Sequence, residues 1–246
     1  MSSLAIDENL ADVQNLFARR TDEVLRYFDF LTAVTDNKAD LLGVLQSDQS
    51  ISKVENFVLS RDLVKTFRAN GYLLLYNLVE STMTNAIDAI HQIFQSKNLN
   101  FDDLRVEVQQ VILKNFRNAA LNESMVLNKT HPIQIAMLRM GYSKKNLFSG
   151  NVDARSIRDT AKIYGFDIAQ HDTSLSRDGL RLVNVKEKRN QLAHGKISFE
   201  ECGHETSHDE LIAIANETVS YLKAVLMGIE VYITQQAYLA DLCNAS

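Results

Sequence analysis

The sequence predicts an all-α protein, on three observations. The chain has one proline and nine glycines among 246 residues, so few positions interrupt a helix. Apolar residues recur at steps of three, four and seven, which is the periodicity of amphipathic helices. Hydrophobic residues make up 46% and charged residues 23% of the chain, the ordinary proportions of a globular protein. Composition therefore argues against disorder and against a fold of many short strands.

The first half of the chain predicts three helices. Residues 9–45 carry an apolar stripe that predicts one long helix, or two with a break between them. Residues 62–95 are the most apolar helical stretch, and we expect this helix to be central. A weaker helix is expected up to Phe116, with Asp102 or Asp103 as its cap.

The middle of the chain is the least regular part. Residues 118–150 contain the only proline, Pro132. Asp153 then predicts the start of a short helix, and Gly165 stands where a left-handed residue would end it. Residues 171–176 are interpreted as a linker.

Two helices are expected near the C-terminus. The first covers residues 175–194 and stops at Gly195. Ser207 and Glu210 form the S-x-x-E pattern of a capping box just ahead of the last helix, over residues 209–239.

We expect a single helical domain over residues 1–246. Within it, residues 118–170 form a less regular insertion, and residues 1–55 form an N-terminal helical segment that is placed less securely. No internal repeat or low-complexity tract divides the chain.

Charge is distributed unevenly along the chain. The net charge is −5, yet residues 139–196 contain twelve lysines and arginines against six acidic residues. The remainder holds 14 basic and 25 acidic residues. A basic segment in an acidic chain favours a local site for a polyanion. The alternative is solvated helix faces over which lysines are unevenly spread.

The cysteines and the N-terminus indicate a compartment. Cys202 and Cys243 provide no disulfide framework. No signal peptide is predicted, because the N-terminus lacks a cationic start followed by an apolar segment. The longest apolar run, 72–79, is too short to span a bilayer. We therefore expect a cytoplasmic protein without a membrane partner.

Arg189, Asn190 and His194, followed by Gly195, end a lysine-rich helix. Arginine binds phosphate oxygens as a fork, and histidine takes and gives protons near neutral pH. Because RNA carries its own nucleophile, the 2'-hydroxyl, these residues could cleave it without a metal. The pattern predicts a phosphodiester-cleaving site.

The spacing of the motif leaves its geometry open. Arg189 and His194 are five residues apart, about 140° around an ideal helix, so they do not stack on one face. Gly195 can end the helix and turn the imidazole, or a two-fold dimer can bring both copies of the motif into one cleft. A third interpretation is a histidine that only offsets the helix dipole.

The R-x4-H spacing is that of the HEPN superfamily, and the chain resembles its RiboL-PSP-type group in three ordered segments. These segments are 71–82 (GYLLLYNLVEST), 149–166 (beginning SGNVDAR and ending YGF) and 188–195 (KRNQLAHG). The resemblance covers roughly residues 60–240. It implies a HEPN-type bundle of long antiparallel helices with a helical insertion.

The same resemblance implies roles for the motif. Arg189 and His194 would be catalytic, with Asn190 as the supporting polar residue. His194 would serve as general base or acid while Arg189 stabilises the phosphorane. The products would be a 2',3'-cyclic phosphate and a 5'-hydroxyl, without a cofactor. The basic residues expected to hold the RNA backbone are Lys186, Lys188, Arg155, Arg158 and Lys196.

Glu80 and Asn77 stand out because they are polar residues in an apolar helix. A buried carboxylate is costly unless it is paired or hydrogen-bonded. We expect these two residues to orient Arg189 or His194. The alternative is that Glu80 faces solvent or a lysine.

We expect a metal-independent endoribonuclease that works as a homodimer with a composite active site. The resemblance implies a toxin or an anti-phage defence effector, with an antitoxin or a defence-system protein as its partner. The alternative is a non-catalytic HEPN-like interaction module, such as an antitoxin, a scaffold or a nuclease-associated subunit. A zinc-binding regulator that uses Cys202, His204 and His208 is a third possibility.

Overall fold

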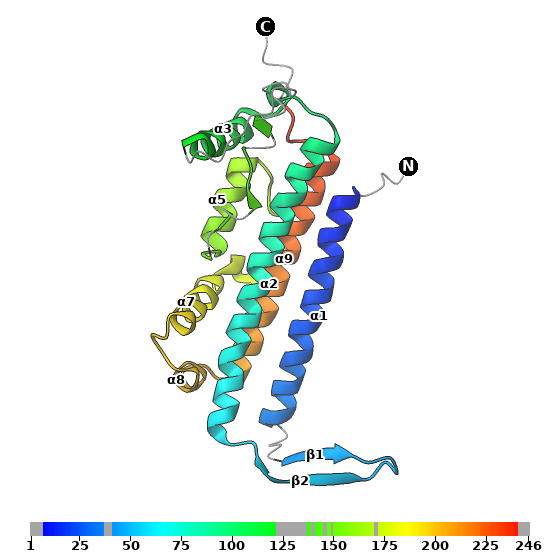
Figure 1. Cartoon of the computed structure of the whole chain (residues 1–246), viewed down its shortest axis with the longest axis vertical. Helices are drawn as coiled ribbons and strands as arrows, with labels where there is room; N and C mark the ends of the chain where they lie inside the picture. Colours follow the sequence, from blue (N-terminus) through cyan, green and yellow to red (C-terminus); the bar gives the residue numbers. More distant parts are fainter. Residues whose placement is uncertain are drawn as a thin grey trace.

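Three long helices lie side by side along the molecule (Figure 1). They are α1 (Glu8–Asp36), α2 (Arg61–Ser96) and α9 (His208–Thr234). The computed structural model describes residues 7–36, 41–121, 137–138, 141–144, 147–148, 150–169 and 172–240. Buried side chains from all three helices join one hydrophobic cluster, to which α3, α5 and α7 also contribute. The expected all-α bundle is confirmed.

The bundle contains both antiparallel and parallel pairs of long helices. α1 runs antiparallel to the other two, since Thr32 near its end lies 3.0 Å from His208 at the start of α9, and Gln14 near its start bonds Glu230. α2 and α9 run in the same direction (Figure 1). α1 is therefore antiparallel to α2 and to α9, whereas α2 and α9 are parallel to each other.

The expected central helix is found as α2. Ser60 begins it by accepting a hydrogen bond from the amide of Leu63 at 3.1 Å. At Gly71 a Cβ would lie 3.3 Å from the Phe28 ring of α1 and 3.2 Å from Leu211 of α9. A small residue therefore lets the three helices approach closely where they cross.

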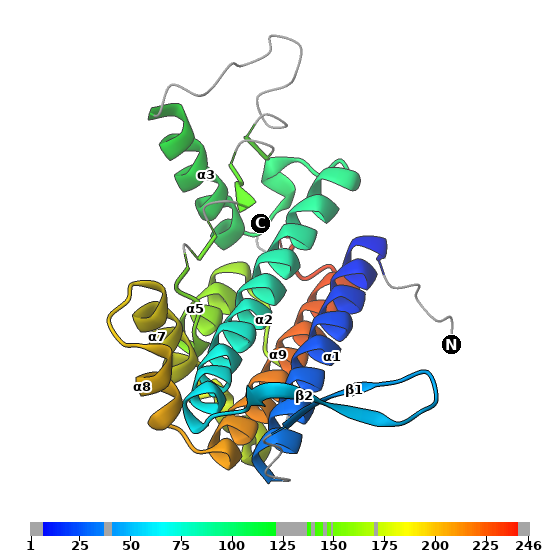
Figure 2. The same cartoon turned by 60° about the horizontal axis from the view of Figure 1, so that its bottom comes forward.

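A β-hairpin between α1 and α2 was not expected. Strands β1 (Leu41–Leu45) and β2 (Ile51–Val58) pair antiparallel and project from the end of the bundle (Figure 2). Between them, Asp48 accepts hydrogen bonds from the amide and hydroxyl of Ser50. The long first helix therefore ends at Asp36, and the prediction that helix extends to residue 45 is wrong.

Helix α3 (Val106–Leu121) starts later than expected. Asp102 and Asp103 lie in the 3-10 turn η1 (Phe101–Asp103), where the Asp103 carboxylate accepts from the amide of Asn100 at 2.7 Å. They are therefore not the caps of α3. Most of the irregular stretch that follows, with Pro132, lies outside the described residues.

Helix α5 (Ala154–Tyr164) has the expected ends. The Asp153 carboxylate accepts from the amide of Ser156 at 2.9 Å, and Gly165 closes the helix with a φ of 82°. Ile157 is fully buried. α5 therefore belongs to the packed bundle and not to a less regular insertion.

The chain between α5 and α9 forms three short helices and a turn. They are α6 (Thr173–Ser176), η3 (Arg177–Gly179), α7 (Leu182–Ala193) and α8 (Phe199–His204). The helix expected from residue 175 starts only at Leu182, because Arg177, Asp178 and Gly179 have φ angles of 46°, 53° and 69°. α8 lies between the two helices expected near the C-terminus, where no helix was predicted. α7 and α8 both pack on α2 (Figure 1).

Helix α9 has both the length and the apolar composition of a membrane-spanning segment. Its most apolar window has a mean hydropathy of 1.3, and 61% of that window is buried inside the bundle. The core helix of a globular bundle has the same properties. As expected, Ser207 caps it, accepting from the amide of Glu210 at 3.2 Å.

Candidate functional site

Arg189 lies on the face of α7 that packs against α2. Its guanidinium carbon is 4.4 Å from the centre of the Tyr76 ring, within the range of a cation–π contact. Its Nη2 is 4.0 Å from Oε2 of Glu80, one turn further along α2. The Arg189 side chain is 29% exposed, so it remains partly accessible to solvent.

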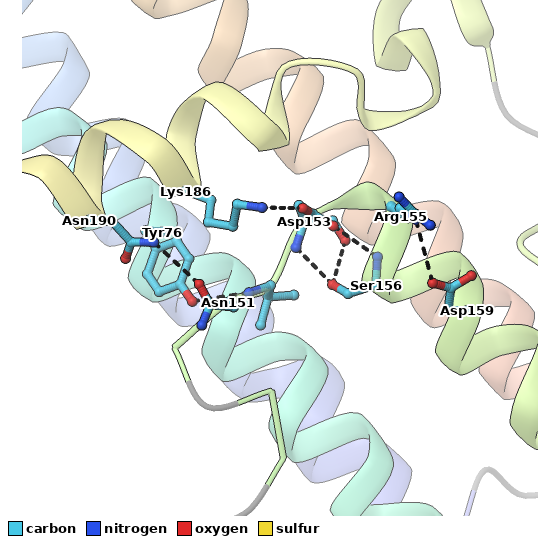
Figure 3. Close-up of polar contacts among 9 residues, drawn as sticks. Tyr76, Asn151, Asp153, Arg155, Ser156, Asp159, Lys186 and Asn190 are labelled. Atoms are coloured by element: carbon cyan, nitrogen blue, oxygen red, sulfur yellow. Dashed lines mark hydrogen bonds and ion pairs between the residues drawn. The ribbon is translucent and has the colours of Figure 1, made fainter.

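Gly150 and Asn190 complete the support of Arg189. Its Nη1 donates to Oδ1 of Asn190 at 2.9 Å and, at 3.5 Å, to the carbonyl of Gly150. Asn190 in turn donates from its amide nitrogen to Oδ1 of Asn151 at 3.3 Å (Figure 3). Gly150 has a φ of 75°, and a Cβ there would lie 3.3 Å from Arg189. The 150–151 turn therefore fits around the arginine.

Tyr76 joins this turn to the core. It is 2% exposed, and its hydroxyl accepts from the amide of Val152 at 3.2 Å. Burial raises the pKa of Tyr76, against the opposing effect of that hydrogen bond. The neutral phenol therefore persists, and the ring provides a fixed surface under Arg189. Tyr76 was not predicted as a site residue; its place one turn before Glu80 was the available signal.

His194 stands at the C-terminal end of α7, where the helix closes in a Schellman motif. The amide of Lys196 donates to the carbonyl of Gln191 at 2.8 Å, and that of Gly195 donates to Leu192 at 3.1 Å. Gly195 has the required left-handed φ of 63°. His194 itself is exposed. Gly195 ends the helix, as expected. In the part of the chain that the structure describes, no hydrogen bond or ion pair links the imidazole of His194 to Arg189 or to the residues that contact it (the Arg189 cluster: Tyr76, Glu80, Gly150 and Asn190).

The two polar residues predicted on α2 have different surroundings. Glu80 faces Arg189, as the orienting role requires. Asn77 is exposed and accepts at 3.3 Å from Arg20 of α1. The structure therefore brings Glu80 to the cluster and leaves Asn77 on another face of α2.

The basic residues expected to hold RNA are partly engaged within the chain. Lys186 contacts Asp153 at 2.5 Å, and Lys188 is ion-paired with Glu205. With side chains 21% and 14% exposed, both lysines have limited access to a ligand. Their charges are largely offset where they stand.

The other three expected RNA-binding residues are exposed. Arg155 lies 4.0 Å from Asp159 on the same helix (Figure 3), a pair that solvent screens. Arg158 donates to the carbonyl of Asp178 at 3.1 Å, and Lys196 follows Gly195. These three residues remain open to an anionic ligand.

The structure does not arrange Cys202, His204 and His208 as ligands of one zinc ion. Cys202 is buried in α8, and burial raises the pKa of its thiol. His204 is exposed, and Nε2 of His208 contacts the hydroxyl of Thr32. Among the described residues, no three histidine, cysteine or acidic side chains are grouped to hold a metal.

The chain folds as a bundle of long packed helices, with Arg189 and His194 at the C-terminal end of the flanking helix α7. A protein-family model described as HEPN_MAE_28990, a HEPN domain family, matches residues 10–238. The match covers most of the chain, so the protein belongs to the HEPN family, which is generally associated with ribonucleases. Neither curated proteins nor solved structures gave a significant match.

Proposed function

We propose that this protein is a metal-independent endoribonuclease of the RiboL-PSP-like type, with Arg189 and His194 as its catalytic residues. One observation carries the proposal. Arg189 is held by Tyr76 and Glu80 of α2 and by its neighbour Asn190, in a chain whose family is associated with ribonucleases. A permanent cation fixed in this way suits the charge that develops on a phosphorane.

The reaction needs a base and an acid. One group removes the proton from the 2'-hydroxyl, whose oxygen attacks the adjacent phosphorus. Another group protonates the departing 5'-oxygen, leaving a 2',3'-cyclic phosphate and a 5'-hydroxyl. A single chain offers one exposed histidine, His194, five residues after Arg189. A homodimer would bring the motifs of two chains to one cleft, so that His194 of one chain serves as base or acid beside Arg189 of the other.

Glu80 and Asn190 would serve to position Arg189. The carboxylate restrains the guanidinium from the α2 side, and the amide restrains it from the side of the 150–151 turn. Preorganised charge of this kind needs no rearrangement as the transition state forms.

The test is cleavage of labelled RNA in EDTA by purified protein. Wild type should cut, and the 2'-deoxy version of the same oligonucleotide should stay intact, because it lacks the nucleophile. His194→Ala and Arg189→Ala should each lose at least about a hundredfold in rate, as expected for loss of a general acid–base group. His204→Ala is the matched control, since this exposed histidine lies outside the cluster. Failure of wild type to cut, or equal cutting by His194→Ala, would refute the proposal.

A non-catalytic interaction module is the second candidate. It is favoured by the pairing of Lys186 with Asp153 and of Lys188 with Glu205, which offsets two of the basic charges expected to bind RNA. This candidate predicts no cleavage and a stable complex with a protein partner. A role as a toxin or a defence effector with a partner protein belongs with the first proposal, and growth arrest on expression that disappears with His194→Ala would support it.

A further inference from the structure

A cavity of about 530 Å³ opens at the end of α7 opposite to His194. The residues that line it are Arg158, Ile168, Arg177, Asp178, Leu180 and Tyr221. They differ from the residues that support Arg189. The volume is that of a site for a small organic group or a single nucleotide.

The turn at η3 places Arg177 at this cavity. Arg177, Asp178 and Gly179 are three consecutive residues with left-handed backbone. Gly179 is needed there, since a Cβ would lie 2.9 Å from the Tyr221 ring of α9 and 3.0 Å from Ala154 of α5. The turn is therefore fixed against two helices of the bundle.

Arg158 reaches the same cavity from α5. Its Nη1 donates to the carbonyl of Asp178 at 3.1 Å, which ties the guanidinium to the turn that bears Arg177. Two arginines from separate elements thus line one cavity, with the carboxylate of Asp178 as the acidic group beside them. The carboxylate of Glu217 also interacts with Arg177, and the guanidinium groups of both arginines are of the kind that fits phosphate oxygens.

The rest of the lining is apolar. Leu180 is 67% exposed, and the ring of Tyr221 is buried at 1%. Exposed apolar surface next to two arginines matches a nucleotide, which has an anionic phosphate and a base with flat apolar faces. Proteins bind single-stranded RNA by combining basic groups for the backbone with surfaces against which bases lie, commonly aromatic rings; in this cavity Leu180 provides the exposed apolar surface.

The cavity and the catalytic motif lie at opposite ends of one helix. Leu180 lies two residues before α7, and His194 is the residue after it; a helix of twelve residues is about 18 Å long. We infer that the cavity holds a flanking nucleotide of the RNA substrate, with its phosphate between Arg158 and Arg177 and its base against Leu180. This inference rests on the proposed ribonuclease function, and it places part of the substrate away from the bond that is cut.

The experiment measures equilibrium binding, so that it does not depend on cleavage. The protein carries His194→Ala, and fluorescence anisotropy reports the binding of single-stranded RNAs of about twelve and about four nucleotides. Arg158→Gln with Arg177→Gln should weaken binding of the long RNA about tenfold and lower its salt slope by about 0.7 for each phosphate that is no longer neutralised. The short RNA, which is expected to bind at the motif alone, should be unaffected.

Two further variants keep the test decisive. Lys162→Gln removes one charge from an exposed position of α5 that does not line the cavity, and it should bind both RNAs as the parent does. Leu180→Glu leaves both arginines and the Arg158–Asp178 hydrogen bond in place, and it should also weaken the long RNA selectively. The inference is overturned if the arginine pair and Leu180→Glu bind like Lys162→Gln, if both RNA lengths weaken equally, or if the parent binds neither RNA. Absence of cleavage by wild type would refute the proposed function separately.

Discussion

Replacing Tyr76 with phenylalanine separates the stability of the fold from the support of Arg189. The hydroxyl of Tyr76 accepts from the amide of Val152 at 3.2 Å, while the ring lies 4.4 Å from the guanidinium carbon of Arg189. Tyr76→Phe removes the acceptor and keeps the ring. It should therefore lower stability and leave the site in place.

The magnitude follows from the loss of one buried acceptor. A buried N–H left without a partner costs about 1–3 kcal/mol. For a chain of this size each kcal/mol shifts Tm by about 2–4 °C, so Tyr76→Phe should lower Tm by about 2–12 °C. Cleavage per folded molecule should stay within about twofold of wild type, because the cation–π interaction of about 0.5–2 kcal/mol remains.

Tyr76→Leu is the matched variant, since it removes the ring as well as the hydroxyl. Without the cation–π interaction that holds Arg189, cleavage should fall by about 2- to 30-fold beyond the effect of lower stability. Thermal unfolding by circular dichroism gives the folded fraction, to which the RNA cleavage rates are normalised. Equal losses of cleavage by the two variants would refute the role of the ring, and an unchanged Tm for Tyr76→Phe would refute the role of the hydroxyl.

Three further predictions concern the bundle. Burial lowers the pKa of His91 from 6.5 to about 3, so between these pH values the unfolded chain binds a proton that the folded chain does not. Stability should therefore fall as pH falls below 6.5, by up to about 1.4 kcal/mol per pH unit in urea unfolding, and more gently in His91→Gln. Asp153→Asn and Asp153→Ala both lose the ion pair with Lys186, but the asparagine keeps an acceptor that caps α5, so Asp153→Ala should cost about 0.5–2 kcal/mol more. Gly203→Ala would place a Cβ 1.9 Å from the carbonyl oxygen of Lys65, so forcing α8 off α2 should cost about 1–3 kcal/mol in thermal unfolding.

Each of these three predictions has an outcome that would contradict it. A flat stability profile from pH 6.5 to pH 4, or one that His91→Gln leaves unchanged, would mean that His91 does not carry the effect. Equal losses for the two Asp153 variants would show that the cap contributes little. Wild-type stability of Gly203→Ala would contradict the close packing of α8. Gly195→Ala is its control, since a Cβ there meets open space and adds only the cost of a left-handed residue, about 1–2 kcal/mol.

Helix ends were predictable where the signal is local. Asp153, Gly165 and Ser207 act through hydrogen bonds and backbone angles within a few residues, so their pattern alone located the ends of α5 and the start of α9. The burial of α2 was also predictable, because its apolar residues leave few solvent-facing positions.

Other features depended on contacts that sequence spacing does not encode. The left-handed turn at Arg177 and Asp178 is held by the approach of Tyr221 and Ala154 to Gly179, so the helix started later than its apolar pattern suggested. The hairpin was missed because Leu41 and Leu45 of its first strand are four residues apart, a spacing that also fits a helix.

Only part of the site could be predicted from the sequence, because the rest also depends on contacts between distant segments. A carboxylate in an apolar helix needs a partner, which pointed to Glu80, and Arg189 is that partner from a distant part of the chain. Asn77 drew attention on the same grounds, but α1 lies against its face of α2 and provides Arg20. Which neighbour covers which face is a property of the assembled bundle.

The central claim is that two chains complete one ribonuclease site from Arg189 and His194. Mixing purified Arg189→Ala and His194→Ala proteins, after unfolding and refolding them together, tests it most directly. If the site combines Arg189 of one chain with His194 of the other, mixed dimers should recover RNA cleavage in EDTA to about a quarter of the wild-type rate, since half of the dimers are mixed and each has one intact pair. A mixture as inactive as either variant alone would contradict the shared site.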